Sequence, residues 1–237
     1  MMVKKTSKTS SNSGNELLEN PEALREGIGR TESFLKSNAK LVGIIGGVVA
    51  LAIIGYFVYQ YTMASKSQEA AEKMYRAEYY FGVDSLDQAL NGDGFYLGFI
   101  DIIEDYGSTK EGNLARFYAG SILLQQGEYQ NAISYLEEFS ASDLLLQARA
   151  YALIGDANME LNKFEEAANA YEKAANYKPN ESFTPIYLAK AGFAYEKANN
   201  NTAAVDMYKQ ILDEYQGSAI YQDARKQHAR LQAMASE

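Results

Sequence analysis

The chain has 237 residues, with 22 Lys/Arg and 31 Asp/Glu that give a formal net charge of −9, and it contains no cysteine. This length suits one or two domains. The absence of thiols from the sequence excludes disulfides, thiol catalysis, thiolate metal sites and lipoprotein attachment. The acidic balance argues against a nucleic-acid partner, since phosphate contact needs a basic surface.

The first forty residues differ in charge from the rest of the chain. They carry seven Lys/Arg and five Asp/Glu, a net charge of +2, whereas the remainder carries 15 and 26, a net charge of −11. Residues 1–19 are mostly small and polar, and we expect a disordered cytoplasmic tail there. Asn20-Pro21 is a typical helix start, so we predict a juxtamembrane helix over 20–40. Its apolar face either lies on the membrane or a partner helix or simply leads into the next segment, and it contains Leu24, Ile28 and Leu35.

Residues 41–63 form the predicted membrane anchor. They contain no charged side chain, and Leu41–Tyr59 is almost continuously apolar. A helix over these nineteen residues would be about 28 Å long, close to the roughly 30 Å hydrocarbon core of a bilayer. A buried helix of a soluble protein would carry polar residues on one face, and a cleaved signal peptide has a shorter apolar run. We therefore predict one retained transmembrane helix, with an aromatic end made by Tyr56, Phe57, Tyr59 and Tyr61.

The distribution of positive charge predicts the orientation of this anchor. Lys and Arg remain on the cytoplasmic side, and seven precede the anchor while three lie in the twenty residues after Met63. The N-terminus is therefore expected in the cytoplasm and the rest of the chain on the opposite side of the membrane. Near the anchor the bias falls to four against three, so the opposite topology stays open.

Two pairs of small residues lie four apart within the anchor. Such pairs let membrane helices approach closely, although glycine is frequent in membrane helices in general. We expect a helix contact there, with another copy of the chain or with a different membrane protein. The residues are Gly43 with Gly47 and Gly46 with Ala50.

Residues 64–112 are predicted to form a helical linker and an irregular first hairpin, with helices over 65–81, 84–90 and 96–106. Asn91–Gly94 separates the last two helices. This acidic, Gly-rich segment lacks the alternating acidic residues and the closing Glu of a calcium loop, so we interpret it as a plain turn.

A spacing that occurs three times organises the next hundred residues. A Gly is followed twelve residues later by an Ala, and four residues after that by a large apolar side chain. The copies are Gly120–Ala132–Leu136, Gly155–Ala167–Tyr171 and Gly192–Ala204–Tyr208. They start 35 and then 37 residues apart, which is a period typical of stacked helical hairpins. The Gly and Ala lie where two helices cross closely, and the large residue lies one turn further along the same face.

This pattern resembles the tetratricopeptide repeat (TPR) family. The resemblance is clearest in the middle copy, where Tyr151 and Phe164 join the repeated residues and Pro179 ends the second helix. The predicted fold is therefore all-α: a single N-terminal transmembrane helix followed by a TPR-type solenoid over 113–218. Its three repeats are expected at 113–147, 148–181 and 185–218.

Residues 218–237 are predicted to form a capping helix, which a solenoid needs to cover its last face. One side of this helix is charged, through Arg225, Lys226 and Arg230. His228 has no nucleophile or metal-ligand motif around it, and we interpret it as facing solvent.

No catalytic motif stands out in the sequence. There is no phosphate-binding Gly-rich loop, HExxH or nucleophile elbow. Adjacent carboxylates such as Glu137-Glu138 point about 100° apart on a helix, so they do not converge for acid–base work. We expect no enzyme activity, cofactor, metal site, nucleic acid or small-molecule substrate.

The first helices of the repeats are expected to build an inner, protein-binding surface. It mixes apolar side chains with both charges and lacks the Lys/Asn/Arg cluster with which some TPR domains clamp a peptide carboxylate. A broad, weak grip on extended or unfolded chains is the resulting hypothesis. The candidate residues are Phe117, Ser121 and Leu124, then Arg149, Asp156 and Met159, then Ile186, Phe193 and Glu196.

The order of these parts resembles the YfgM-type inner-membrane TPR proteins in a Bacteroidetes-like form. The similarity covers residues 20–235 and includes the lead-in Phe34–Lys40, the Gly-rich anchor, Lys66 with Glu69-Ala70-Ala71, and the repeats. It implies an ancillary role at the Sec translocon, with SecYEG subunits, a PpiD-like chaperone or unfolded clients as partners. The chain departs from the family in its longer tail and in the insertion at Asn91–Gly94.

These features predict a non-catalytic, single-span TPR adaptor that assists protein translocation or hands emerging chains to chaperones. Two alternatives remain. One is a scaffold for envelope or outer-membrane assembly, and the other is a cytosol-facing import receptor with the opposite topology.

Overall fold

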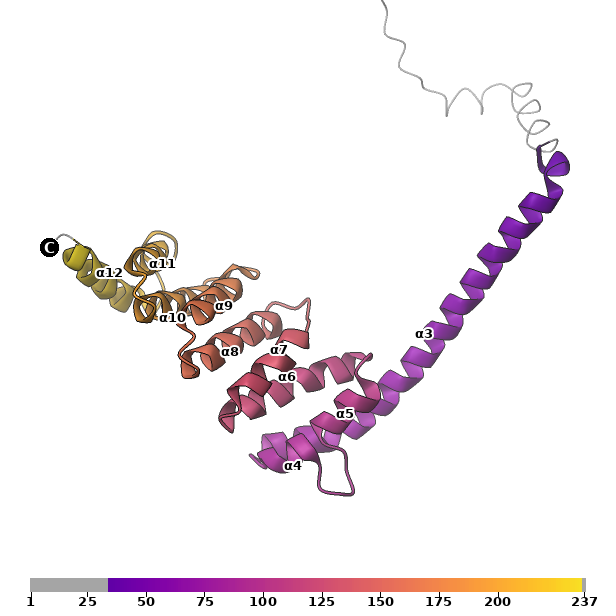
Figure 1. Cartoon of the computed structure of the whole chain (residues 1–237), viewed down its shortest axis with the longest axis horizontal. Coiled ribbons are helices and arrows are strands. Elements are labelled where there is room, and N and C mark those ends of the chain that lie inside the picture. Colours follow the sequence, from indigo (N-terminus) through magenta and orange to yellow (C-terminus); the bar gives the residue numbers. More distant parts are fainter. Residues whose placement is uncertain (1–33, 236–237) are drawn as a thin grey trace, which may run out of the picture. The chain divides into compact units, whose positions relative to one another are not determined.

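The computed structural model describes residues 34–235, and over that range the chain is helical with no strand (Figure 1). The all-α prediction is confirmed for these residues. The predicted tail over 1–19 and the first part of the juxtamembrane helix lie outside the described residues. The chain divides into two units, Met1–Thr62 and Met63–Glu237.

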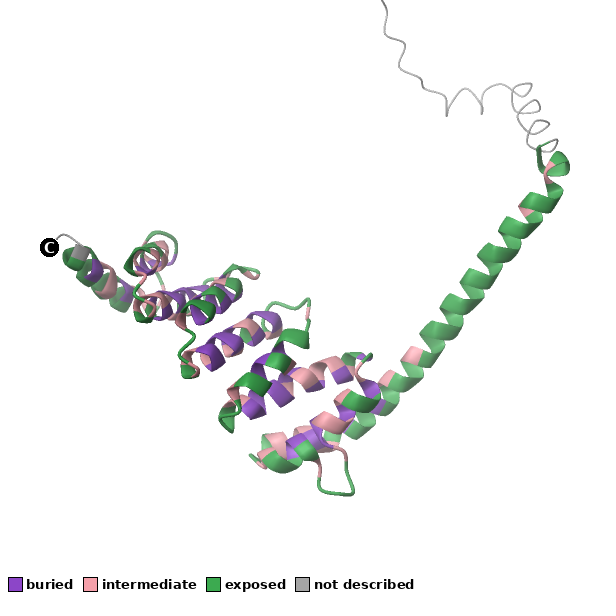
Figure 2. Cartoon of the chain, viewed as in Figure 1, coloured by how far each residue is buried: buried purple, intermediate pink, exposed green. Residues whose placement is uncertain are grey.

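The described part of the first unit is almost entirely the exposed, apolar part of α3 (Ala39–Gly82). Residues 34–37 form a short helical stretch, and a turn at Asn38 separates it from α3. Among the described helices, α3 is the one long and apolar enough to cross a membrane, and none of its apolar stretch is buried (Figure 2). These properties fit a single-pass helix.

The second unit begins with the remainder of α3. Ala70, Met74 and Ala77 are buried there, so this part of the helix belongs to the core of the unit. Two short helices follow, α4 (Leu86–Asn91) and α5 (Phe99–Tyr106). The sequence placed the start of the second at residue 96, three residues too early. The Asp93 carboxylate accepts hydrogen bonds from the amides of Phe95 and Tyr96, and these hold the chain in a turn before the helix starts.

Three antiparallel hairpins and a final helix make up the rest of this unit. The two helices of each hairpin pack against each other, and successive hairpins pack side by side. The hairpins are α6 (Lys110–Gln125) with α7 (Tyr129–Glu138), α8 (Leu146–Glu160) with α9 (Phe164–Asn176), and α10 (Thr184–Lys197) with α11 (Asn201–Glu214). Helix α12 (Tyr221–Ala235) packs on α11 and buries Ala224 and Leu231, as expected of a cap.

The repeated Gly lies where the two helices of each hairpin touch. A Cβ atom added to Gly120 would lie 2.5 Å from Cγ of Leu136. The same atom on Gly155 would lie 2.5 Å from the ring of Tyr171, and on Gly192 it would lie 2.8 Å from the ring of Tyr208. The large side chain sixteen residues after each Gly therefore fills the space that the missing side chain leaves.

Each hairpin also turns through the same motif. The residue seven positions after the repeated Gly has a positive φ, 83° at Gly127, 57° at Asn162 and 61° at Asn199. Gly and Asn adopt this left-handed conformation most readily. The amide of the following residue then donates to the carbonyl five residues earlier, as in the bond from Glu128 to Leu123. This pattern is a Schellman motif, which satisfies the last carbonyl groups of a helix.

The same register occurs a fourth time, at the junction of α3 and α4, where the sequence spacing did not reveal it. Asp84 has a φ of 60°, and the Ser85 amide donates to the Tyr80 carbonyl. Seven residues before Asp84 stands the buried Ala77, and twelve residues after Ala77 stands the buried Ala89. The residue sixteen positions after Ala77 is Asp93, which lies in a loop, so no large side chain excludes a methyl group at position 77. Helices α3 and α4 thus form a divergent repeat that precedes the three hairpins, and its second helix stops at Asn91.

Candidate protein-binding groove

A groove with a volume of about 590 Å³ lies between α8 and α10, the first helices of the second and third hairpins. Its mouth is formed by large apolar side chains that are 40–50% exposed. They are Leu144, Leu145, Phe183 and Ile186. Isolated exposed apolar residues are normal, but a cluster of them lining a hollow marks an interaction site.

Small residues on α8 open the groove. Ala152 stands three residues before Gly155 and lines it together with Ala148. At the equivalent position of α6, three residues before Gly120, stands Phe117, which is only 7% exposed. The Phe117 ring packs 5.3 Å from the ring of Phe139. A large side chain therefore fills this place in the first hairpin, and a methyl group leaves it open in the second.

Side-chain oxygens position both loops at the mouth of the groove. Before α8, the Asp143 carboxylate accepts hydrogen bonds from the amides of Leu145 and Leu146, and these bonds lower the pKa of Asp143. Before α10, the Asn180 side chain accepts hydrogen bonds from the amides of Ser182 and Phe183 in the same way. The two equivalent turns hold the exposed Leu145 and Phe183 at the starts of neighbouring helices.

The far end of the groove contains a paired charge. Lys190 on α10 lies 2.7 Å from Oδ1 of Asp156 on α8, and the Tyr171 hydroxyl donates to the same oxygen at 2.6 Å. Burial, followed by this hydrogen bond to Asp156, raises the pKa of Tyr171 far above its usual range. The ammonium group of Lys190 also lies 5.3 Å from the centre of the Tyr171 ring. The charge of Lys190 is therefore already compensated within the repeat array.

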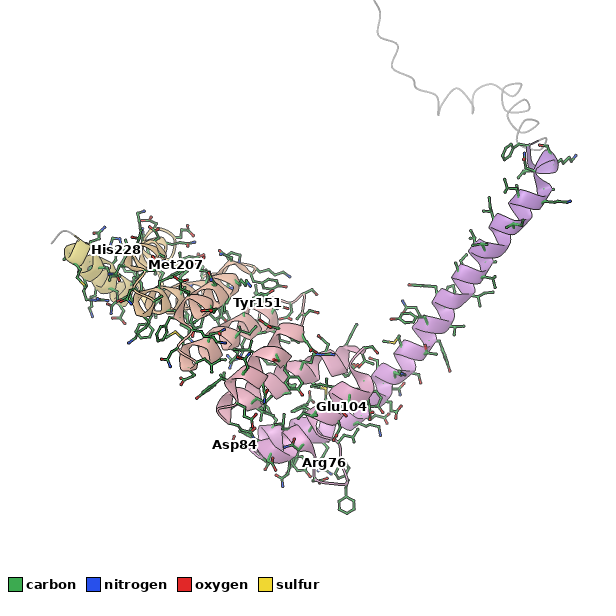
Figure 3. All side chains as sticks on the ribbon, in the orientation of Figure 1. Arg76, Asp84, Glu104, Tyr151, Met207 and His228 are labelled. Carbon is green, nitrogen blue, oxygen red and sulfur yellow. The ribbon has the colours of Figure 1, made fainter. Side chains whose placement is uncertain are left out.

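Arg149 is different, because its side chain is exposed and makes no hydrogen bond or ion pair within the described part of the chain. The Arg149 guanidinium group interacts electrostatically with Tyr187 on α10, on the other side of the groove. Burial raises the pKa of the Tyr187 phenol, and the nearby guanidinium group of Arg149 acts in the opposite direction. The groove thus combines an apolar mouth with one positive charge that has no ion-pair partner among the described residues. Figure 3 shows the side chains of the described residues on the ribbon.

A related triad joins the third hairpin to the cap. The Tyr208 hydroxyl donates to Glu196 at 2.8 Å, and the guanidinium group of Arg230 on α12 pairs with the same carboxylate. In both places a tyrosine of the second helix, a carboxylate of the first helix and a cation of the following element are connected. The first hairpin has Leu136 at the tyrosine position, so it has no such triad. These bonds fix the register between successive elements.

The structure brings three of the predicted surface residues into the groove, namely Arg149, Asp156 and Ile186. Phe193 is exposed outside it, with the Lys197 ammonium group 5.3 Å from its ring. Met159 is partly buried, and Glu196 is occupied by its triad.

The prediction was wrong for two of the three residues in the first repeat. Phe117 and Ser121 are buried, and the Ser121 hydroxyl donates to the Phe117 carbonyl at 2.7 Å. Leu124 is partly buried between two core clusters. The physical reason is the Phe117 side chain itself, which closes the space that would otherwise be exposed.

Sequence reasoning missed the apolar mouth of the groove. Leu144, Leu145 and Phe183 stand in the loops before the first helices, and the prediction considered only helix positions. The run Leu144-Leu145-Leu146 immediately before a helix was the available signal, because a loop normally carries few such residues.

Three other predicted features have different outcomes. The small residues Gly43, Gly46, Gly47 and Ala50 lie on α3, and a Cβ added to any of these glycines meets no atom within 4 Å, so the membrane-helix contact stays a prediction. His228 is partly buried rather than facing solvent, and its Nε2 is buried without a hydrogen-bond partner among the described residues. The predicted turn at Asn91–Gly94 starts one residue later than expected, since Asn91 ends α4, and both Asp93 oxygens accept bonds from the protein. Across residues 34–235 no cluster of side chains is suited to a metal ion.

Comparison with known proteins identifies the repeats. The family model described as "Tetratricopeptide repeat" matches residues 104–144, 119–182 and 153–219. The chain is also similar to a curated protein of Guillardia theta that bears the name "Uncharacterized protein ycf37", with 32% identity over 120 residues. That alignment covers 49% of this chain and 66% of the relative, slightly less than two thirds of its length. Residues 104–219 therefore match tetratricopeptide repeats, and arrays of such repeats typically bind other proteins.

Proposed function

We propose that the chain is a non-catalytic, membrane-anchored adaptor that holds protein partners in the groove between α8 and α10. The observation that carries this proposal is the open, apolar mouth of the groove, in which Leu145 and Phe183 remain exposed between two hairpins. Arrays of this kind present extended surfaces to partners, and exposed apolar clusters on them act as anchors.

We further propose where the adaptor acts. The charge bias across the anchor supports a cytoplasmic N-terminus and a periplasmic repeat domain at a bacterial inner membrane. The resemblance to the YfgM-type proteins supports translocon subunits, a PpiD-like chaperone or unfolded clients as partners. The two alternatives, an envelope-assembly scaffold and a cytosol-facing receptor, differ from this proposal in partner and in topology.

Cysteine labelling tests the topology with little background, because the natural chain has no cysteine. A single cysteine at Glu165, an exposed position on α9, should react with a membrane-impermeant maleimide in intact spheroplasts. A cysteine at Ser7 should react only after the membrane is opened. The reverse pattern would establish the cytosol-facing alternative.

Site-specific crosslinking tests the partner and the groove together. A photoreactive residue at Ile186, in the groove, should capture translocon subunits or a periplasmic chaperone. The matched control places it at Gln222, an exposed position on α12. Envelope-assembly proteins captured at Ile186 would favour the scaffold alternative. Equal capture at both positions would show that the groove is not the interface.

A further inference from the structure

The groove carries a positive charge in an otherwise acidic part of the chain. From residue 41 onward the sequence has 15 Lys/Arg and 26 Asp/Glu. The groove lining reverses this balance, with Arg149 and Lys190 against Asp156. Because Lys190 is paired with Asp156, the unbalanced charge is that of Arg149.

The position of Arg149 places this charge next to the apolar mouth. Arg149 lies four residues after Leu145 and four before Leu153, and residues four apart are neighbours on a helix surface. It stands within about one turn of the start of α8, where the helix dipole is also positive. Neither α8 nor α10 has an acidic residue in its first turn. The Asp143 carboxylate just before α8 accepts from the Leu145 and Leu146 amides and offsets part of the dipole, so the positive charge at the mouth is mainly that of Arg149. The mouth therefore offers apolar contact and a site for a negative group side by side.

We propose that the occupant is an extended segment of a partner protein in which an Asp or Glu stands among apolar side chains. Its carboxylate pairs with Arg149, and its apolar side chains pack against Leu145 and Ile186. The inference rests on the proposed function, because it names the ligand of the same groove. The eleven residue steps from Leu145 to Asp156 correspond to about 16 Å of helix, which is the length of about five residues of extended chain.

Specific binding through Arg149 and nonspecific attraction to the whole domain favour peptides of opposite charge, so the two can be distinguished. The acidic domain as a whole attracts basic peptides and repels acidic ones. A preference for an acidic residue can then come only from a local feature such as Arg149. The order of affinities among otherwise identical peptides thus identifies which field controls binding.

Peptide binding to the full chain in phosphatidylcholine nanodiscs provides the test. The probes are three fluorescein-labelled ten-residue peptides with Leu at alternate positions and a central Glu, Gln or Lys, followed by fluorescence anisotropy. We expect the Glu peptide to bind most tightly and the Lys peptide about five- to tenfold more weakly. Raising the salt concentration should reduce this difference.

Two variants assign the preference to Arg149. Arg149→Gln should make the Glu and Gln peptides equal, and Arg149→Glu should reverse the order. Arg149 is exposed, so both variants should keep the fold, and circular dichroism checks this. The control is Arg225→Glu, which makes the same charge change at an exposed position of α12 and should leave the order unchanged.

The remaining outcomes each overturn one proposal. Equal binding of the three peptides, or a preference for Lys, would overturn the acidic ligand. The adaptor proposal would survive that result if Leu145→Ser and Ile186→Ser weakened all three peptides. No peptide binding, together with disulfide formation between two copies of an Ile186→Cys chain, would show that a second copy occupies the groove. Absence of both peptide binding and partner crosslinks at Ile186 would contradict the proposed function itself.

Discussion

A single missing side chain sets how closely the two helices of each hairpin approach. At Gly155 the space is filled by the ring of Tyr171, which is 3% exposed and is held in place by its bond to Asp156. The ring cannot swing away without breaking that bond. At Ala77 the corresponding side chain is absent from the contact, and a methyl group is accommodated. The spacing in the sequence thus reflects a volume compensation, in which a large side chain fills the space left by the glycine sixteen residues earlier.

Gly155→Ala should destabilise the domain by up to about 2 kcal/mol. Overpacking of a core typically costs about 1–3 kcal/mol, and the better helix propensity of Ala offsets about 1 kcal/mol of this. Urea unfolding followed by circular dichroism measures the change.

The matched control for that variant is Gly82→Ala, because a Cβ at Gly82 meets nothing within 4 Å. It should leave the stability unchanged or raise it slightly. Adding Tyr171→Ala to Gly155→Ala should cost less than the sum of the two single changes, since the ring no longer clashes. Strict additivity would contradict the proposed contact.

The Gly–Ala–apolar spacing was enough to predict the hairpins, since close helix crossings restrict side-chain size wherever they occur. It could not reveal the divergent first repeat, because Ala77 replaces the Gly there and Asp93 replaces the large residue. Nor could it distinguish Phe117 from the exposed residues of α8. Whether a side chain on the first helix is buried depends on its volume and on what the neighbouring hairpin presents. The loop residues of the groove were missed because their exposure is fixed by turns, which the helical period does not describe.

At the level of elements, the loop between α4 and α5 is ordered by one carboxylate. Asp93 accepts bonds from the amides of Phe95 and Tyr96 and from the Tyr80 hydroxyl at 2.6 Å. The hydrogen bond from Tyr80, and then those from the backbone, lower the pKa of Asp93 to about 2. The Arg76 guanidinium group lies 4.5 Å from the centre of the Tyr96 ring and supports the same loop. Phe95 is held at its tip with 94% of its surface exposed.

The order of this loop should depend on pH in a predictable direction. The pKa of Asp93 is lower in the folded chain than its ordinary value of 3.8, so the ionised carboxylate stabilises the loop. This stabilisation is complete above pH 3.8 and is lost as the pH falls toward about 2. Hydrogen exchange of the Phe95 and Tyr96 amides measures how strongly Asp93 stabilises the loop. At pH 6 an Asp93→Asn chain should be less protected there than the natural chain, and at pH 2.5 the difference should shrink.

Asp206→Asn is the control for that experiment, since Asp206 is exposed on α11 and far along the chain from the loop. It should not change the protection of either amide at any pH. A difference between the Asp93→Asn and natural chains that stays constant from pH 6 to pH 2.5 would show that the carboxylate charge does not order the loop.

On the scale of the whole molecule, α3 contributes to both units of the chain. Its residues up to Thr62 are exposed and apolar, whereas Met74 and its neighbours are buried in the second unit. Two hydrogen bonds add to this packing: Tyr106 donates to Glu69 at 2.8 Å, and Ser67 donates to Glu111. Burial and the Glu69 bond raise the pKa of Tyr106 to about 12. The repeat domain therefore starts well before the residues that match the repeat family.

Two truncated chains should differ in stability for this reason. A fragment that begins at Met63 should unfold cooperatively and remain soluble, because it lacks the exposed apolar part of α3. A fragment that begins at Val83 loses Met74, whose burial is worth about 1.5–3 kcal/mol, and should melt about 5–10 °C lower. Thermal melts followed at 222 nm compare them, and equal melting temperatures would show that α3 is not part of the core.

The loop around Phe95 has a narrow base and a free tip, and this has a practical consequence. A Cβ at Gly92 would lie 2.4 Å from the Tyr96 carbonyl oxygen, and one at Gly98 would lie 2.3 Å from the Gly92 nitrogen. The two sides of the loop therefore lie too close together at its base to admit a side chain at either glycine. A Cβ at Gly94 meets nothing within 4 Å. Added residues between Gly94 and Phe95 would therefore extend outward without entering the core, although they would lengthen the turn in which Asp93 accepts bonds from the Phe95 and Tyr96 amides. This is the place in the chain where an epitope or a fluorescent reporter can be introduced while the groove between α8 and α10 is left untouched.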